Sequence, residues 1–468
     1  MDGAGPDVAD TRPEIRQVVR TAFDALDASP RVPPLAERRA WLMALRAATR
    51  RAAEDLARAV DADFGGRPRA ETLVAEVGLV LSSIDWTARR LGRWMRPRRP
   101  RLPPEFLSAR ARVERVPLGR VGILAPWNYP VQLALLPLAT ALAGGNRALV
   151  KPSEFTPRTA EALARLIEGA LPGDVVRVVT GGPEVAAAVS SLPLDGLFFT
   201  GSTATGRKVA RAAAENLVPL VLELGGKSPA IILPDADMDA AALSIMAGKL
   251  FSAGQTCVAP DYALVPRRRV GEMVEALRRA AARLHPDPAR PDYAALARAG
   301  DRDRLLGLLE GYQTVPLMDP MPEAPRLGPF AVLDPDPDSR LMREEIFGPI
   351  LPLVPYDDPA EAEAFANARP CPLALYVFGR DTAAAEGVVA RVRSGGAMVN
   401  DTLLHVAAHS LPFGGAGESG MGAYHGEEGF LALTRPRSVM VAGRWMPAAM
   451  ARPPYGRAMD RLLRWLIR

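Results

Sequence analysis

A long stretch without charged residues, between Arg120 and Arg147, constrains the fold more than any other part of the chain. An apolar stretch of about 20 residues is what a membrane-spanning helix requires. Here the stretch is interrupted by residues that break helices, namely Pro126, Pro130, Pro137, Gly144 and Gly145. It therefore predicts several short buried elements, which are a strand (121–126), a loop (127–130), a core helix (131–145) and a second strand (147–153).

Strand and helix patterns alternate on both sides of this stretch. Residues 13–98 have Ala, Leu and Arg at helical spacing, broken at Pro33 and Pro34. Downstream, the predicted elements are a helix (157–170), a strand (174–181), a helix (183–191), a strand (195–201) and a helix after it. A second run of this kind follows Glu223. Because apolar strands separated by helices pair in parallel and are covered on both faces, we expect an α/β protein.

The net charge of +5 and the isoelectric point near 9.4 do not indicate nucleic-acid binding. Basic residues are scattered over Ala-rich helices, and the one dense run, residues 89–101, is predicted to be a solvated connector at a domain edge. The two cysteines cannot build a disulfide framework, and the first residues lack the apolar run of a signal peptide. We therefore expect a cytoplasmic protein without a nucleic-acid partner.

Lysine is rare in this chain and is confined to Lys151, Lys208, Lys227 and Lys249, whereas arginine fills almost every other basic position. An ammonium group is a compact point donor on a flexible stem, which a planar guanidinium does not replace. The four lysines lie close together in the sequence. We therefore expect the functional site to draw on the segment that contains them.

Two glycine-rich segments are candidates for holding a cofactor. GAGESG (415–420) has the spacing G-x-G-x-x-G, but it does not open a helix after a strand and no acidic residue follows within a βαβ unit. We interpret it as a tight loop. In FFTGSTATG (198–206), a strand ends, a Gly-Ser-Thr turn follows and a helix begins, which predicts an anion site at the helix N-terminus. The alternative is that these residues only cap the helix.

Cys257 lies in FSAGQTCVAPDY, between a polar turn that begins with Gly254 and a Val-Ala-Pro segment. A buried cysteine usually packs as a small hydrophobe, and we assign that role to Cys371. The segment around Cys257 instead predicts a side chain that is presented rather than packed in a core. His405 and His409 lack a neighbouring cluster of ligands, so we predict no metal site.

Seven motifs then occur in order along the chain, APWNYP, KPSEFTP, FFTGSTATG, LELGGKSPAII, GQTCVAPDY, EEIFGPILP and PFGGAGESGMGAYHG. Together they closely resemble the aldehyde dehydrogenase superfamily, and the resemblance covers nearly the whole chain. GQTCVAPDY and SGMGAYHG are most similar to the class 3 branch, which includes fatty, aromatic and coniferyl aldehyde dehydrogenases. The resemblance implies NAD(P)-dependent oxidation of an aldehyde to a carboxylic acid.

The resemblance also implies a fold. We expect a Rossmann-type dinucleotide-binding domain (1–97 and 118–222), an α/β catalytic domain (223–403), a small β bridging or oligomerisation element (98–117 and 404–442) and a C-terminal tail (443–468). A homodimer is expected.

The resemblance assigns three catalytic residues. Cys257 matches the nucleophile, whose thiolate adds to the aldehyde carbonyl and later carries the acyl group as a thioester. Asn128 matches the residue whose side-chain amide holds the developing oxyanion together with the Cys257 backbone N–H. Glu223 matches the general base that activates water against the thioester.

The remaining residues assigned by the resemblance bind the cofactor or line the substrate pocket. Lys151 and Glu154 match the residues that hold the adenosine ribose, and a carboxylate there favours NAD, with NADP possible. The full set for the cofactor is Trp127, Lys151, Glu154, Gly201, Ser202, Gly206, Glu345 and Phe347. Glu345 is also a second candidate for the base, and the predicted substrate pocket contains Tyr129 and Phe413.

Two other functions fit a chain of this family. One is a catalytically silent relative with a structural or binding role, which the joint presence of Cys257, Glu223 and Asn128 opposes. The other is an enzyme that passes the acyl group to coenzyme A. Such enzymes typically lack the glutamate found here at Glu223, which favours hydrolysis.

The tail from Gly456 to Arg468 has Met459, Leu462, Leu463 and Leu466 at helical spacing, with arginines around the other side and Trp465 near the border. Such a helix packs its apolar stripe on its own dimer, or it makes a weak contact with an anionic membrane surface. We favour the dimer.

Overall fold

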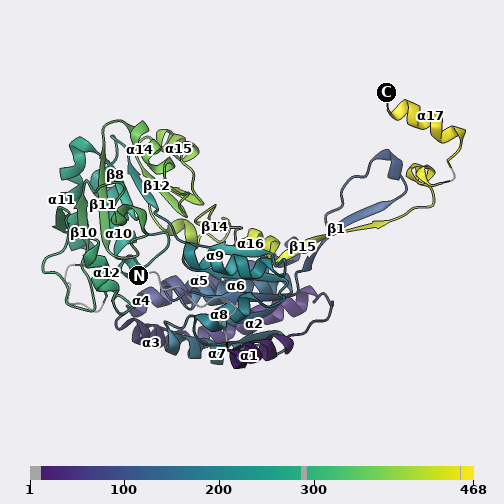
Figure 1. The fold of residues 1–468 in the computed structure, drawn as a ribbon, viewed down its shortest axis with the longest axis horizontal. Coiled ribbons are helices and arrows are strands. Elements are labelled where there is room, and N and C mark those ends of the chain that lie inside the picture. The colour runs from purple at the N-terminus through teal and green to yellow at the C-terminus, as the bar shows by residue number, and fades with distance from the viewer. Residues whose placement is uncertain (1–11, 286–291, 454, 468) are drawn as a thin grey trace.

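The computed structural model describes residues 12–285, 292–453 and 455–467. Two α/β bodies lie side by side, and a two-stranded arm projects from one of them (Figure 1). One body holds a six-stranded sheet in the order β14-β6-β5-β2-β3-β4, and the other holds a seven-stranded sheet in the order β13-β12-β7-β8-β11-β10-β9. Within these two sheets the pairs are parallel except for β14 with β6 and β9 with β10. The predicted α/β class is confirmed.

The strands of the six-stranded sheet are β2 (Arg120–Leu124), β3 (Arg147–Lys151), β4 (Val176–Val178), β5 (Gly196–Thr200), β6 (Leu220–Glu223) and β14 (Gly420–Met421). Those of the seven-stranded sheet are β7 (Pro229–Ile232), β8 (Tyr262–Pro266), β9 (Thr314–Pro316), β10 (Phe330–Leu333), β11 (Ile350–Tyr356), β12 (Ala374–Phe378) and β13 (Gly396–Val399). The arm pairs β1 (Arg110–Pro117) with β15 (Thr434–Val441) in antiparallel register.

The helices before the second sheet are α1 (Pro13–Asp24), α2 (Leu35–Arg51), α3 (Ala53–Phe64), α4 (Arg69–Thr72), α5 (Leu79–Trp94), α6 (Gln132–Gly144), α7 (Pro157–Ala170), α8 (Pro183–Ser190) and α9 (Thr203–Ala214). Later helices are α10 (Met238–Leu250), α11 (Val270–Leu284), α12 (Asp301–Gly307), α13 (Arg340–Arg343), α14 (Pro359–Asn367), α15 (Thr382–Arg391), α16 (Gly426–Ala432) and α17 (Arg457–Leu466). A π-helical turn, η2 (Leu73–Gly78), joins α4 to α5, and short 3₁₀ turns are η3 (Pro104–Phe106), η4 (Phe251–Gly254), η5 (Arg267–Arg269), η6 (Leu404–Ala407) and η7 (Pro447–Ala451).

The uncharged stretch folds as predicted into a strand, a loop and a buried helix. β2 and β3 pair in parallel, and α6 connects them. The helix ends at Gly145, whose φ of 83° is left-handed and therefore suits a residue without a Cβ. In the described part of the chain, no helix is long and apolar enough to cross a membrane.

Each face of the six-stranded sheet is covered by its own set of helices. On one face Val121, Ile123 and Val150 join a core with α2, α5, α6 and α7. On the other face Leu149 and Leu197 join a core with α1, α8 and α9. Alternate residues of each strand point to opposite faces, which is the reason that these strands are apolar throughout. The seven-stranded sheet is covered in the same way, by α10 and α11 on one face and by α14 and α15 on the other.

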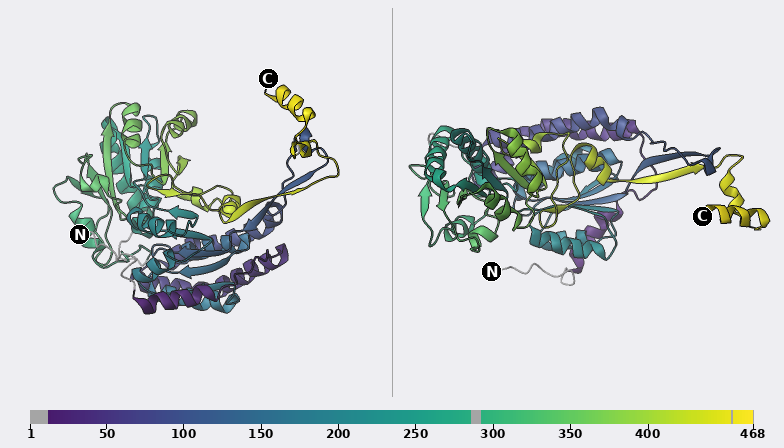
Figure 2. Two further views of the ribbon diagram at one scale, coloured as in Figure 1. Left: turned by 45° about the vertical axis from the view of Figure 1, so that its right-hand side comes forward. Right: turned by 90° about the horizontal axis from the view of Figure 1, so that it is seen from above.

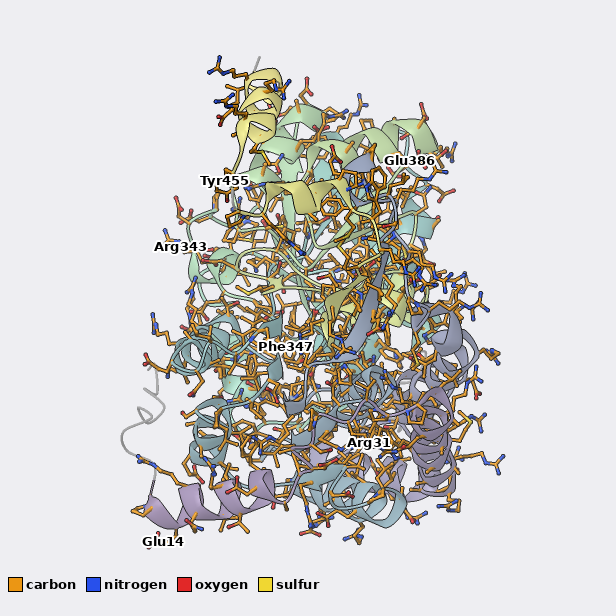
Figure 3. All side chains as sticks on the ribbon, turned by 90° about the vertical axis from the view of Figure 1, so that its right-hand side faces the viewer. Glu14, Arg31, Arg343, Phe347, Glu386 and Tyr455 are labelled. Carbon is orange, nitrogen blue, oxygen red and sulfur yellow. The ribbon has the colours of Figure 1, made fainter. Side chains whose placement is uncertain are left out.

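The arm and tail extend away from both bodies in the views of Figures 1 and 2. The basic run 89–101 begins in the last turns of α5 and leads into the arm, where Arg98 forms an isolated β-bridge with Val113. This agrees with the prediction that the run is a connector. The tail forms the predicted helix, α17. Met459 in it is buried and Leu463 is 44% exposed, whereas the side chains of Leu462, Trp465 and Leu466 lie outside the described residues. Tyr455, which precedes α17, lies at the edge of the molecule, far from Phe347 in its middle (Figure 3).

Candidate active site

The carboxyl ends of four strands bring the candidate residues to one edge of the six-stranded sheet. Strand order reverses between β2 and β5, because β3 lies beyond β2 on one side and β6 beyond β5 on the other. Ligands of open parallel sheets bind in the crevice at such a reversal, outside the carboxyl ends of the strands. Here β2 leads into the Asn128 loop, β3 ends at Lys151, β5 leads into Gly201, and β6 ends at Glu223.

The loop after β2 is bonded directly to the loop that carries Cys257. Asn128 is buried, and its Nδ2 donates to the backbone oxygen of Gln255 at 3.1 Å. The hydroxyl of Tyr129 lies 2.7 Å from Thr256 Oγ1, so the two residues share a hydrogen bond. The side chains of Asn128 and Tyr129, from the body with the six-stranded sheet, therefore contact the two residues that precede Cys257 in the other body.

Cys257 is partly exposed, and the pKa of its thiol is raised. Burial raises the pKa of the thiol, and the carboxylates of Glu345 and Glu223 raise it further, while the backbone N–H groups of Cys257 and Val258 act in the opposite direction. A base must therefore take the thiol proton before the sulfur can attack. Cys371 is also a free, partly buried cysteine, and burial raises its pKa too.

Glu223 is the least compensated acid among these residues. It is 3% exposed, both carboxylate oxygens lack a hydrogen-bond partner among the described residues, and burial raises its pKa well above 4.5. Its backbone pairs with Gly420, so GAGESG forms a tight loop against the end of β6, as interpreted from the sequence. The Glu223 carbonyl also accepts from Gly201 N at 3.0 Å, which links the base candidate to the glycine turn.

Glu345 approaches the same region from a second buried cluster of charges. Burial and the charge of Asp261 raise the pKa of Glu345 to about 8. A Cβ on Gly225 would lie 2.0 Å from Glu345 Oε2, so this close approach requires glycine. Lys227 forms an ion pair with Asp261. Lys249 is buried, has no hydrogen-bond partner in the part of the chain that the structure describes, and has its pKa lowered to about 8 by burial. Two of the four lysines therefore stand beside Glu345.

Aromatic rings surround the bonded loops. The rings of Trp127 and Phe347 lie 5.5 Å apart, and Phe413 packs against Tyr424 at 5.8 Å. Burial raises the pKa of Tyr424 well above its ordinary value, and the nearby Glu223 and Cys257 act in the same direction. The His425 ring lies 4.3 Å from the Tyr424 ring and is buried, and neither of its nitrogens has a hydrogen-bond partner within residues 12–285, 292–453 and 455–467. Sequence reasoning missed Tyr424 and His425, although both stand in the motif SGMGAYHG.

The cofactor candidates form a second group along the same edge. Lys151 is buried at the end of β3, and its Nζ donates to Glu154 at 2.5 Å. Ser202 caps α9 by accepting from Thr205 N at 3.3 Å, and Gly206 lies in the first turn of that helix, where a Cβ would meet Leu224 at 2.6 Å. The N-terminus of α9 therefore faces the crevice and can hold an anion.

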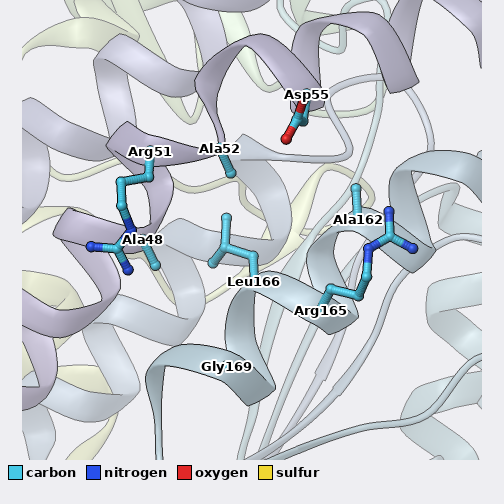
Figure 4. A pocket seen from close by; sticks show the side chains of 8 residues that line it. All are labelled: Ala48, Arg51, Ala52, Asp55, Ala162, Arg165, Leu166 and Gly169. Atoms are coloured by element: carbon cyan, nitrogen blue, oxygen red, sulfur yellow. The ribbon is translucent and has the colours of Figure 1, made fainter.

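A separate surface pocket of about 310 Å³ lies between α2, α3 and α7 (Figure 4). Its charged lining, Arg51, Asp55 and Arg165, is exposed, and it contains none of the candidate residues. It therefore plays no part in the site at the sheet edge.

Comparisons with known proteins agree on one family. Residues 8–439 match the aldehyde dehydrogenase family. A probable coniferyl aldehyde dehydrogenase of Pseudomonas aeruginosa is 45% identical, over 92% of each chain. A dimeric, NADP-preferring aldehyde dehydrogenase of Canis lupus familiaris is 36% identical, over 92% of this chain and 94% of its own. The crystal structure of a Mycobacterium tuberculosis aldehyde dehydrogenase with NAD+ superposes with a TM-score of 0.82 at 32% identity, over 94% of this chain and 91% of the other.

Proposed function

Because the chain belongs to the aldehyde dehydrogenase family and oxidises aldehydes with NAD or NADP, we propose that Cys257, Asn128 and Glu223 carry out this reaction. The observation that carries the proposal is the bonding of the Asn128 loop onto the Cys257 loop, next to an uncompensated buried glutamate. A panel of aliphatic and aromatic aldehydes, assayed for NADH and NADPH formation, tests it and identifies the preferred aldehyde.

The first bond of the reaction forms at the Cys257 sulfur, after the thiol has been deprotonated. The thiol loses its proton to a nearby base, and the sulfur adds to the aldehyde carbon to give a thiohemiacetal. NAD or NADP, when bound, would supply the two-electron acceptor for the hydride on that carbon. Loss of the hydride leaves a thioester on Cys257, which water cleaves to release the carboxylic acid and restore the thiol.

Asn128 stabilises the negative charge that develops on the aldehyde oxygen. One N–H of its side-chain amide is used by Gln255, and the other remains for the oxyanion. A fixed amide in a water-poor site lowers the barrier by about 3–4 kcal/mol, because it is oriented before the charge appears.

Glu223 activates the water that cleaves the thioester. Burial without a partner keeps its pKa raised, which makes the carboxylate a stronger base than an exposed glutamate. Glu345, whose pKa burial raises to about 8, is the second candidate for this role, and it would contact the nicotinamide end of the cofactor.

The residues along the sheet edge suit a dinucleotide. Lys151 and Glu154 offer a cation and a carboxylate to ribose hydroxyls, and Gly201 with Ser202 leaves room for a pyrophosphate at the start of α9. Trp127 and Phe347 would border the nicotinamide ring. The Glu154 carboxylate repels a 2′-phosphate, so we propose a preference for NAD over NADP.

We expect Lys151→Arg to weaken NAD binding by roughly tenfold, since a planar fork on a different stem cannot replace a point donor in a buried position. Calorimetric titration of NAD and the KM for NAD measure the change. Lys208→Arg is the matched control, because Lys208 is an exposed lysine on α9 and its replacement should leave both values unchanged. NAD affinity equal to that of the wild type in Lys151→Arg would contradict the assignment.

We also propose that the protein is a homodimer held through the arm. An isolated two-stranded ribbon is marginally stable in water, and this one exposes Met440, Val441 and the nearby Trp445. A second copy that covers the ribbon would bury these side chains.

The tail gives a prediction of its own. If α17 packs on the dimer, the full-length protein and a chain ending at Pro454 should partition alike in flotation with anionic vesicles, and light scattering should show a dimer for the full-length protein. Flotation of the full-length protein alone would instead support contact with a membrane surface, to which a basic helix with an apolar face is suited.

A further inference from the structure

A buried arginine, Arg67, lies behind the two bonded loops. It follows α3, is 1% exposed, and its guanidinium packs over the ring of Tyr129 at 4.5 Å. Its Nη1 donates to the backbone oxygen of Asn128 at 2.6 Å. Glu71 lies 3.8 Å away and Glu76 3.5 Å away, so one cation stands between two buried carboxylates.

Glu76 holds the other end of the Asn128 loop. It lies in the π-helical turn η2, a local irregularity that is frequent at functional sites. Its Oε2 accepts from Val131 N at 2.7 Å and from Gln132 N at 3.2 Å, where α6 begins. Arg67 bonds the carbonyl of Asn128, and Glu76 bonds the backbone N–H groups where α6 begins. The loop is therefore held on both sides.

Glu71 reaches the segment that leads to the nucleophile. Its two carboxylate oxygens accept from Ser252 N at 3.3 and 3.2 Å. Ser252 and Ala253 both have φ of 50°, a left-handed conformation that is unfavourable for residues with a Cβ. Such strain persists only where the surroundings hold it, and it is concentrated at functional sites. Glu71 is one of the groups that hold it here.

We propose that Arg67, with Glu71 and Glu76, is a positioning residue that sets the Asn128 amide against the Cys257 sulfur. This inference rests on the proposed roles of Asn128 and Cys257. Arg67 does not touch the reacting atoms. It acts through the Asn128 loop on one side and, through Glu71, on the Ser252 turn on the other.

A role in stability alone does not account for this arrangement. Buried ion pairs are often no more stabilising than apolar residues of the same shape, because the charges lose their hydration. A guanidinium has five N–H donors, but Nε and Nη2 of Arg67 find no hydrogen-bond partner among the residues that the structure describes. The hydrogen bond from its Nη1 goes to Asn128, the residue that carries the proposed oxyanion donor.

A double-mutant cycle on the pre-steady-state burst of NADH separates positioning from folding. We expect Arg67→Met to slow the burst by about 10- to 100-fold, since a displacement of about 1 Å at a reacting centre has effects of this size. Asn128→Ala should slow it by about 10²- to 10³-fold. The double variant should be no slower than Asn128→Ala, because without the amide there is nothing left for Arg67 to position. NAD affinity should be unchanged in all three variants.

Arg38→Met is the matched control, because Arg38 is another fully buried arginine that donates to backbone carbonyls, those of Pro33 and Ala143, away from the site. It should lower the melting temperature and leave the burst rate per active site unchanged. Arg67→Lys keeps the positive charge and should therefore retain part of the burst rate that Arg67→Met loses. If Arg67→Met does not fold, the burst rate of Arg67→Lys replaces it in the double-mutant cycle.

The outcomes distinguish this inference from the proposed function. Losses that multiply in the double variant would overturn positioning by Arg67 and leave the role of Asn128 intact. A full burst rate in Asn128→Ala would overturn both.

Discussion

Replacement of Cys257 by alanine should abolish NADH formation and leave NAD binding unchanged. A nucleophile and its base act together in the same step. Loss of the nucleophile therefore lowers turnover by at least about 10⁴-fold. The proposed cofactor contacts lie on other segments, at the ends of β3 and β5, so calorimetry should return the wild-type affinity for NAD. Turnover is measured by NADH absorbance with saturating aldehyde.

Cys371→Ala is the matched control for this variant. Cys371 is the other cysteine of the chain, it is free and partly buried, and its Sγ lies 3.9 Å from the Pro372 oxygen. It should keep full activity. Dehydrogenase activity in Cys257→Ala, or its loss in Cys371→Ala, would show that the nucleophile has been misassigned.

Glu223→Gln should give one equivalent of NADH per active site and then stop. The first half of the reaction ends when the thioester has formed on Cys257, and only the second half needs a base for water. Loss of a general base lowers the rate of its step by about 10²- to 10⁴-fold, so acyl enzyme accumulates. Stopped-flow absorbance resolves the burst, and steady-state assays measure the slow phase.

The pH dependence of the wild-type enzyme follows from the same group. Burial raises the pKa of Glu223, so the carboxylate that acts as base is scarce at low pH and becomes more abundant as pH rises through that raised value. The hydrolytic step should therefore accelerate with rising pH and level off above it. If Glu345 is the base instead, the rate of hydrolysis should rise around pH 8, and the same rise should be seen in Glu223→Gln.

Coenzyme A distinguishes hydrolysis from acyl transfer. Hydrolysis by Glu223 predicts continuous wild-type turnover in buffer alone. A burst in the wild-type enzyme that continues only when coenzyme A is added would assign the chain to the acylating enzymes instead.

Much of the fold could be predicted from local signals. The prolines and glycines between Arg120 and Arg147 divide an apolar stretch into elements that each bury their own surface, and the alternation around them requires a parallel sheet. The proposed catalytic residues stand in contiguous motifs, because each lies at the end of a strand or in a loop next to one: Asn128 after β2, Glu223 at the end of β6 and Cys257 before β8.

The positioning network could not be predicted in that way. Arg67 meets Asn128 only because the chain after α3 returns to the loop that follows β2, and Glu71 meets Ser252 across the two bodies. The hydrophobic periodicity of the sequence predicts helices and strands, but it does not predict contacts between distant segments. The left-handed turn at Ser252 is equally hidden, since neither Ser nor Ala signals a positive φ.

Mass spectrometry of Glu223→Gln after incubation with NAD and an aldehyde tests the central assignment most directly. The account predicts that the peptide containing Cys257 gains the mass of the acyl group in near-stoichiometric yield, that the peptide containing Cys371 is unmodified, and that hydroxylamine removes the adduct. An unmodified Cys257 peptide in protein that has produced its one equivalent of NADH would contradict it.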